Sequence, residues 1–131
     1  MAEPFRHRLR VRWGECDEQG VAYFVNYAEY VDIALTELWR ERVRPYAEMV
    51  RSGTDLMVVA MELAFRRPAR FDEEVDVVLE VERLGETSLT SAWRVERDGD
   101  VLCSGTITHV CIDPAAQAKK RIPDDLRAAL A

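Results

Sequence analysis

The residue best placed to do chemistry is Asp17, in the loop Gly14–Gly20 between a predicted strand and a predicted long helix. A carboxylate at such a junction can face a substrate carbonyl whose oxygen binds the free backbone N–H groups of the helix N-terminus. An aspartate ahead of a helix is also a common turn former or helix cap. The local pattern therefore leaves both a catalytic and a structural role open for Asp17.

Cysteine and histidine residues are the next candidates. Cys16 is a potential nucleophile, but no neighbouring residue in the sequence supports its pairing with a histidine. Cys103, His109 and Cys111 share one parity of a predicted strand. Structural zinc sites use four ligands that are closely paired in turns, so a buried structural role is favoured for these three residues.

Four arginines give the first predicted strand a basic face: Arg6, Arg8, Arg10 and Arg12. Guanidinium groups suit phosphates, but the acidic run Glu74–Glu82 offers carboxylates for cross-strand ion pairs, and that interpretation is favoured. The sequence has no glycine-rich nucleotide loop and no Gly-x-Ser-x-Gly nucleophile motif. The basic face therefore predicts charge pairing.

The composition is that of a folded domain. The 131 residues are 48% hydrophobic and 32% charged, and 18 Lys and Arg against 24 Asp and Glu give a net charge of −6. This balance argues against disorder and against a nucleic-acid partner, which needs concentrated positive charge. No apolar run reaches the roughly 20 residues that span a bilayer, and the sequence opens with no signal-peptide pattern. We expect one domain over residues 1–131, no membrane partner and a cytoplasmic location.

The elements around the Asp17 loop follow from hydrophobic periodicity. Residues 5–15 alternate, which predicts a strand with Trp13 on its apolar face. Over residues 26–42 apolar side chains recur at three- and four-residue steps, which predicts one long, largely buried helix. Asn26 followed by Glu29 predicts a capping box at its start.

The second half of the chain has mainly strand patterns. The predicted elements are a short helical or irregular segment over 45–52, strands over 57–65, 75–81, 87–97 and 101–112, and a short helix over 122–130. The odd-numbered positions from Met57 to Phe65 share one apolar face, and Asp98-Gly99 predicts a hairpin. Together these elements predict an α+β fold, in which an antiparallel sheet of about five strands wraps around one long central helix.

The segment Trp13–Tyr27 resembles the signature of the 4-hydroxybenzoyl-CoA thioesterase family of hotdog-fold proteins. It has an Asp-x-x-Gly-x-x-aromatic stretch ahead of Asn-Tyr, and the likeness continues through Ala34–Glu37 and Phe65–Glu73 to cover about residues 5–125. The resemblance implies a hotdog fold and the hydrolysis of an acyl or aroyl thioester to free acid and thiol. It implies no metal or redox cofactor, since CoA would be part of the substrate.

The resemblance also implies roles for five residues. Asp17 corresponds to the catalytic carboxylate, and the backbone N–H of Phe24 corresponds to the donor that polarises the thioester carbonyl. Tyr23, Asn26 and Tyr27 match positions that line or support the substrate site. The carboxylate can attack the thioester or activate a water, and the sequence leaves both routes open.

The sequence departs from the family pattern in two places. Several members carry histidine where Phe24 stands, so a histidine-assisted reaction is not expected here. The segment Glu82–Glu86 offers only Arg83 for nucleotide phosphates. The expected substrate is therefore an acyl-CoA or an acyl-carrier-protein thioester, and the resemblance implies a homodimer or homotetramer that binds the acyl chain between subunits.

Two other functions compete with the thioesterase. A non-catalytic hotdog module could bind an acyl thioester as a sensor or pathway accessory, because a fold does not fix a function. A hydroxyacyl dehydratase on the same fold would need a histidine in the helix region, and none lies between His7 and His109. The presence of Asp17 favours the thioesterase.

Overall fold

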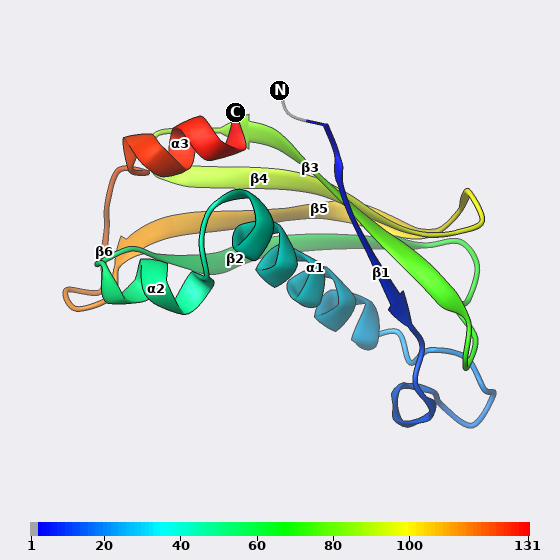
Figure 1. Ribbon diagram of the computed structural model, residues 1–131. Coiled ribbons are helices and arrows are strands. Elements are labelled where there is room, and N and C mark those ends of the chain that lie inside the picture. Colours follow the sequence, from blue (N-terminus) through cyan, green and yellow to red (C-terminus); the bar gives the residue numbers. More distant parts are fainter. Residues whose placement is uncertain (1–2) are drawn as a thin grey trace.

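The computed structural model describes residues 3–131. Its elements are β1 (Phe5–Arg10), the 3₁₀-helix η1 (Trp13–Glu15), α1 (Asn26–Arg42), α2 (Tyr46–Arg51), β2 (Asp55–Phe65), β3 (Glu74–Leu84), β4 (Ser88–Arg97), β5 (Asp100–Asp113), β6 (Ala118–Lys119) and α3 (Asp124–Leu130). The sheet order is β1-β3-β4-β5-β2, with β6 paired to β5. Figure 1 shows this sheet curling around α1, which confirms the predicted α+β architecture.

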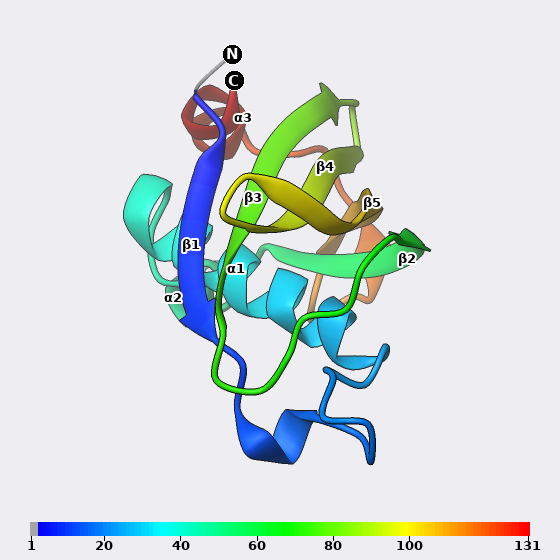
Figure 2. The same ribbon diagram turned by 90° about the vertical axis from the view of Figure 1, so that its right-hand side faces the viewer.

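Every pairing in the sheet is antiparallel. The β4–β5 hairpin turns at Asp98 and Gly99, whose φ angles of 52° and 85° are those of a tight type I′ turn, as the Asp-Gly signal predicts. Figure 2 shows β1 and β2 at opposite edges of the curled sheet, with α1 between them. Each edge strand therefore has one side without a partner strand within the described chain.

Helix α1 is the centre of the hydrophobic core. Its buried residues recur at the predicted helical spacing: Tyr27, Tyr30, Val31, Ala34, Leu35, Leu38 and Trp39. The predicted capping box is wrong, because no side chain caps the helix N-terminus. The amide Nδ2 of Asn26 instead donates to the carbonyl oxygen of Glu15 at 2.7 Å, which ties the helix start to the preceding loop. No helix within residues 3–131 is long and apolar enough to cross a membrane.

The first strand is shorter than its alternation predicts. β1 ends at Arg10 and the chain turns through η1, so the prediction of a strand over 5–15 is wrong for residues 11–15. Trp13 is 68% exposed, and its ring packs edge-on against Phe71. The Glu15 carboxylate stabilises this turn, since it accepts the backbone N–H of Arg12 at 2.7 Å and its guanidinium at 2.9 Å.

The edge strand β2 contains a bulge that the sequence pattern hides. Its register against β5 shifts between Val58 and Ala60. As a result Leu56 and Met61, which have opposite parity, both pack against the core, whereas Met57 and Val59 are about half exposed. The prediction of one apolar parity along the whole strand is therefore wrong, because an extra residue in a strand reverses the faces beyond it.

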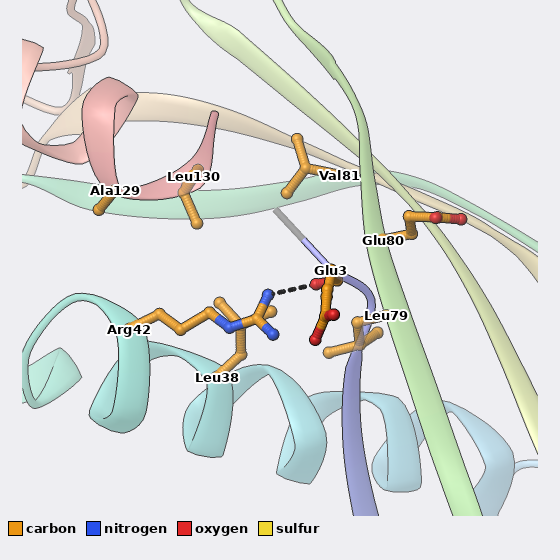
Figure 3. A pocket seen from close by; sticks show the side chains of 8 residues that line it. All are labelled: Glu3, Leu38, Arg42, Leu79, Glu80, Val81, Ala129 and Leu130. Carbon is orange, nitrogen blue, oxygen red and sulfur yellow. Dashed lines mark hydrogen bonds between the residues drawn. The ribbon is translucent and has the colours of Figure 1, made fainter. Parts of the chain in front are cut away.

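Helix α3 closes one end of the sheet beside the C-terminal end of α1. Leu38, Ala129 and Leu130 line a small cavity there (Figure 3), where Arg42 donates to the backbone oxygen of Glu3 at 2.7 Å. The cavity has about 10 Å³, which is at most the room of one water molecule. It is therefore too small for a substrate.

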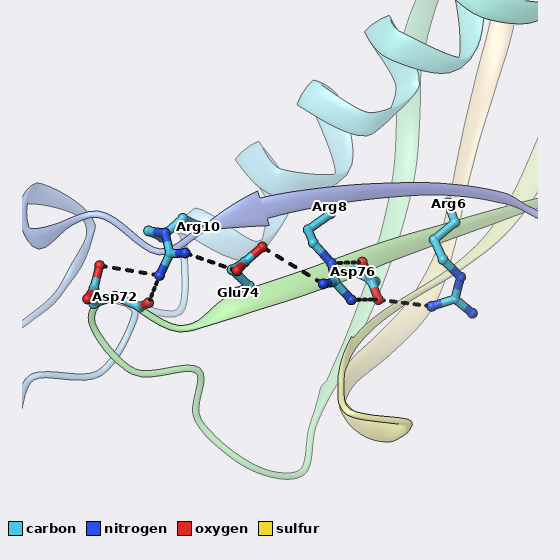
Figure 4. Close-up of polar contacts among 6 residues, drawn as sticks. All are labelled: Arg6, Arg8, Arg10, Asp72, Glu74 and Asp76. Carbon is cyan, nitrogen blue, oxygen red and sulfur yellow. Dashed lines mark hydrogen bonds and ion pairs between the residues drawn. The ribbon is translucent and has the colours of Figure 1, made fainter.

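The basic face of β1 pairs with acidic residues of the neighbouring strand (Figure 4). Arg8 makes two hydrogen bonds to Asp76, at 3.0 and 3.2 Å, and Arg6 reaches the same carboxylate at 3.2 Å. Arg10 binds Glu74 at 2.9 Å. The interpretation of this face as cross-strand charge pairing is confirmed for Arg6, Arg8 and Arg10. It is wrong for Arg12, which lies beyond the end of β1 and pairs locally with Glu15.

This pairing predicts a loss of stability in acid. The hydrogen bond from Arg8, helped by Arg6 and opposed by burial, holds the pKa of Asp76 below its ordinary value. Because the pKa is depressed in the folded protein, the stabilisation is fully present above about pH 4, the pKa of an aspartate in the unfolded chain. It is lost as the pH falls through the lower pKa of Asp76 in the folded protein. Asp76→Asn should therefore cost about 1 kcal/mol at pH 7. Chemical denaturation should show this cost shrinking below about pH 4, and a cost independent of pH would contradict the assignment.

Candidate active site

Asp17 lies at a tight turn whose flanking residues, Cys16 and Ala22, pair as an antiparallel bridge. The N–H of Gly20 donates to the carbonyl oxygen of Asp17 at 3.0 Å, and the positive φ of Gly20, 74°, suits a glycine. The backbone N–H of Gln19 donates to Asp17 Oδ1 at 2.8 Å. No hydrogen bond from residues 3–131 reaches Oδ2, so this exposed oxygen is free to act on a bound molecule.

The backbone N–H of Phe24 is the second free group. At the start of α1 the N–H groups of Asn26, Tyr27 and Ala28 each donate to the carbonyl three residues earlier. The N–H of Phe24 has no acceptor among the described residues 3–131. Because the helix dipole adds partial positive charge at this end, the group suits an oxygen that gains negative charge.

Asp17 and Phe24 line the same hollow, which we call the loop pocket. It has a volume of about 300 Å³, and its lining residues are Asp17, Val21, Ala22, Phe24, Tyr27, Phe65, Arg66, Arg67 and Pro68. The ring of Phe65 packs edge-on against Phe24 and Tyr27, with centroids 6.2 and 5.7 Å apart. The lining of the loop pocket therefore combines aromatic residues with one acidic residue and two arginines, and it includes Phe24, whose N–H has no acceptor within residues 3–131.

The residues expected to line or support a substrate site take different positions. Tyr27 is buried in the wall of the loop pocket, and its hydroxyl accepts a backbone N–H of the loop after β2 at 2.9 Å. Asn26 binds the carbonyl of Glu15 and so holds the loop against the helix. Tyr23 is 47% exposed outside the lining, with its ring edge-on to Phe24 at 5.0 Å.

Glu15 supports the site although the sequence pattern does not single it out. Its buried carboxylate accepts hydrogen bonds from the Arg12 backbone at 2.7 Å and the Tyr30 hydroxyl at 3.0 Å. Burial alone would raise the pKa of Glu15, but the hydrogen bonds from Arg12 and Tyr30 hold it below its ordinary value. The Glu15 carbonyl also accepts the N–H of Tyr23 at 2.9 Å. An ionised Glu15 thus fixes the Asp17 loop to α1.

Cys16 is poorly suited to act as a nucleophile. Its thiol donates a weak hydrogen bond to the carbonyl of Arg12 at 3.6 Å and does not line the loop pocket. Burial, together with the negative charges of Glu15 and Asp17, raises the pKa of this thiol. Because the thiolate is the reactive form, these surroundings disfavour thiol chemistry.

A second hollow, which we call the helix cavity, lies further along α1. It has about 360 Å³ and is lined by Asp32, Leu35, Thr36, Trp39, Tyr46, Asp55, Leu56, Val58 and His109. His109 is buried, which lowers its pKa, and its Nδ1 has no partner among the described residues. No three His, Cys, Asp or Glu side chains within residues 3–131 are arranged to hold a metal ion. The helix cavity lacks both Asp17 and the Phe24 N–H.

Comparison with known proteins extends this description. The profile of the thioesterase-like superfamily matches residues 11–130. The acyl-CoA thioester hydrolase YbgC of Escherichia coli O6:H1 is 26% identical over 123 residues, which cover 93% of this chain and 92% of that protein. The crystal structure of TT1821 from Thermus thermophilus, a hypothetical protein, is 34% identical, covers 95% of each chain and has a TM-score of 0.89. The 1,4-dihydroxy-2-naphthoyl-CoA thioesterase Slr0204 from Synechocystis shares the fold, with a TM-score of 0.89 at 18% identity over 98% of this chain and 96% of its own.

Proposed function

The chain belongs to the thioesterase-like superfamily, and from this membership and the geometry of the loop pocket we propose that it hydrolyses acyl-CoA thioesters to free acid and CoA. The observation that carries the proposal is the meeting of two unsatisfied groups in one hollow. Asp17 Oδ2 and the N–H of Phe24 both lack partners within residues 3–131, and both residues line the loop pocket.

The two groups match what thioester hydrolysis requires. A thioester carbonyl oxygen gains negative charge when its carbon is attacked, and a fixed N–H donor stabilises that charge without reorganising. The Phe24 N–H supplies this donor at the positive end of α1. The Asp17 carboxylate then either attacks the carbonyl carbon or activates the water that attacks it. The Gln19 N–H, which donates to Oδ1, holds the carboxylate in place. Tyr27 and Asn26 support the site, and Tyr23 packs behind Phe24.

The walls of the loop pocket favour an aromatic acyl group. The ring of Phe65 contacts the rings of Phe24 and Tyr27 edge-on, and the three rings offer an apolar surface on which a further ring can pack. Among the relatives, Slr0204 is a thioesterase of an aromatic CoA ester. We therefore propose an aromatic acyl-CoA as the preferred substrate over a long-chain acyl-CoA.

A thiol-release assay tests this function. Purified protein is mixed with benzoyl-, butyryl- and palmitoyl-CoA and with the matching acyl-carrier proteins, and the free thiol is measured. We expect hydrolysis of CoA thioesters, with the highest kcat/KM for the aromatic group. Binding of these thioesters without release of thiol would instead indicate a non-catalytic acyl-binding module.

We further propose that the protein self-associates through the β2 edge. Met57, Val58 and Val59 form an apolar run on this strand and are each about half exposed, next to backbone groups with no partner strand in the described chain. Such edges favour pairing with another strand. A two-fold β2–β2 contact would join the sheets of two copies into a dimer, and two dimers could form a tetramer.

Sedimentation analysis tests this interface. The wild-type protein should sediment at twice the 15.0-kDa chain mass or more at micromolar concentration. Val59→Lys places a charge on the edge and should shift the protein toward the monomer, because edge lysines oppose strand pairing. Glu62→Gln, an exposed control on the same strand that adds no lysine and leaves the apolar run intact, should weaken association less. A wild-type monomer would contradict the proposal.

A further inference from the structure

The lining of the loop pocket includes two basic residues, Arg66 and Arg67. Within residues 3–131, ten of the 18 Lys and Arg residues form an ion pair with an acidic side chain. Arg66, which lines the loop pocket, forms none within residues 3–131. The pair of its neighbour Arg67 with Asp100 is long, at 3.5 Å, and both of those side chains are more than 60% exposed. An exposed ion pair of this kind contributes little to stability, so the guanidinium groups of Arg66 and Arg67 are both available to a ligand.

The backbone of these two arginines is held firmly. The N–H groups of Arg66 and Arg67 both donate to the carbonyl oxygen of Leu102 on β5, at 2.8 and 3.1 Å. Leu102 is fully buried. Two residues after Arg67, the backbone N–H of Ala69 donates to the hydroxyl of Tyr27 and holds the loop there. The two side chains therefore project from a fixed part of the fold, which limits the entropy lost when they bind.

The charge of the protein makes a local basic site necessary for an anionic substrate. The net charge is −6, which repels a multiply charged molecule such as CoA. At the loop pocket, however, Asp17 is the one acidic residue in the lining, against Arg66 and Arg67. The lining of the loop pocket thus carries more basic than acidic residues, in contrast to the protein as a whole.

The two ends of the substrate would meet different parts of the loop pocket. With the acyl group against the aromatic wall, as proposed above, the solvent-exposed guanidinium groups of Arg66 and Arg67 are left for the thiol carrier. The thiol carrier must leave through the open side. We propose that Arg66 and Arg67 form a phosphate-binding rim that holds the phosphopantetheine arm of CoA as it leaves the loop pocket. The proposal rests on the proposed thioesterase function.

Arginine suits this task because its planar guanidinium can bind two phosphate oxygens at once. The rim contacts the carrier and not the reacting carbonyl, so it acts on substrate binding alone. Its removal should raise KM for an acyl-CoA and leave kcat unchanged. A role in holding the fold would instead lower kcat or stability together with affinity.

Calorimetric binding of three carriers tests the rim directly: CoA, 4′-phosphopantetheine and pantetheine, which has no phosphate. For the double variant Arg66→Ala/Arg67→Ala we expect CoA to bind at least about tenfold more weakly, or about 1.4 kcal/mol. Pantetheine should bind both proteins equally. Arg66→Lys/Arg67→Lys should recover part of the CoA affinity, because it keeps the charge but not the planar fork.

Arg51→Ala is the matched control, since Arg51 is exposed, forms no ion pair within the described chain and lies outside the loop pocket. It should not change CoA affinity. Equal CoA affinity in wild type and double variant would overturn the proposal, as would an equal loss of pantetheine binding. A loss with CoA but not with 4′-phosphopantetheine would move the contact to the nucleotide phosphates and overturn the assignment to the arm.

The proposed function is tested separately with benzoyl-pantetheine, a thioester that has no phosphate for the rim to bind. Its hydrolysis by the wild type and by Arg66→Ala/Arg67→Ala at the same rate would support both the hydrolase and the rim. Failure of the wild type to hydrolyse any thioester would reject the hydrolase, whereas the CoA titration would still decide on the rim.

Discussion

Replacement of Asp17 by asparagine is expected to remove nearly all thioester hydrolysis and to leave the protein folded. Asparagine keeps an oxygen that can accept the Gln19 N–H, which is 2.8 Å from Asp17 Oδ1, so the turn can persist. It loses the charge on the free oxygen that acts at the carbonyl. Loss of such a group lowers rates by about 10²- to 10⁴-fold. The rate of thiol release from benzoyl-CoA measures the effect.

Glu18→Gln is the matched control for this substitution. Glu18 is the adjacent exposed carboxylate and does not line the loop pocket, so its neutralisation should change the rate less than about twofold. The Asp17→Asn protein should also unfold at the same denaturant concentration as the wild type. Retention of more than about a tenth of the wild-type rate would refute the role of Asp17, because a catalytic carboxylate is worth far more.

Gly105→Ala should have the largest effect on stability. Gly105 lies on β5 opposite Leu63 of β2, and a Cβ added there would stand 1.8 Å from the backbone oxygen of Glu62 and 3.1 Å from the ring of Trp93. Because the contact is with backbone, β2 would have to separate from β5. We expect a loss of about 3 kcal/mol or more in the free energy of unfolding, measured by chemical denaturation.

Gly14→Ala is the control for this effect, since a Cβ at Gly14 would meet no atom within 4 Å and its φ is not positive. It should change stability by less than about 0.5 kcal/mol. The displaced β2 would also carry Phe65 away from the loop pocket, so Gly105→Ala should lose activity as well. Equal stability of the two glycine variants would show that β2 and β5 are not packed this closely.

Elements with a long, regular pattern could be predicted from the sequence. The α1 helix follows its apolar spacing from Asn26 to Arg42, and β3 follows its alternation against acidic residues. The errors arise where one contact overrides the local pattern. Trp13 continues the alternation of β1, but the hydrogen bonds between Arg12 and Glu15 turn the chain away. The bulge near Val59 leaves no signal in an apolar run.

The candidate site could be predicted only in part, because it is assembled from distant segments. The loop with Asp17 and Phe24 is continuous in sequence, so a local motif points to it. Arg66 and Arg67 come from the end of β2, and tertiary contacts such as the hydrogen bond of Tyr27 bring that segment to the helix N-terminus. The family pattern points to the segment Glu82–Glu86 for nucleotide phosphates, and its one arginine, Arg83, lies outside the loop pocket.

A crystal structure with a non-hydrolysable benzoyl-CoA analogue, in which a methylene replaces the thioester sulfur, tests the central claim most directly. We expect the carbonyl oxygen of the analogue to lie within about 2.7–3.2 Å of the Phe24 nitrogen, which is a hydrogen-bond distance. The carbonyl carbon should face Asp17 Oδ2. The ring should pack against Phe65. A carbonyl bound in the helix cavity beside His109, away from Asp17, would contradict the account.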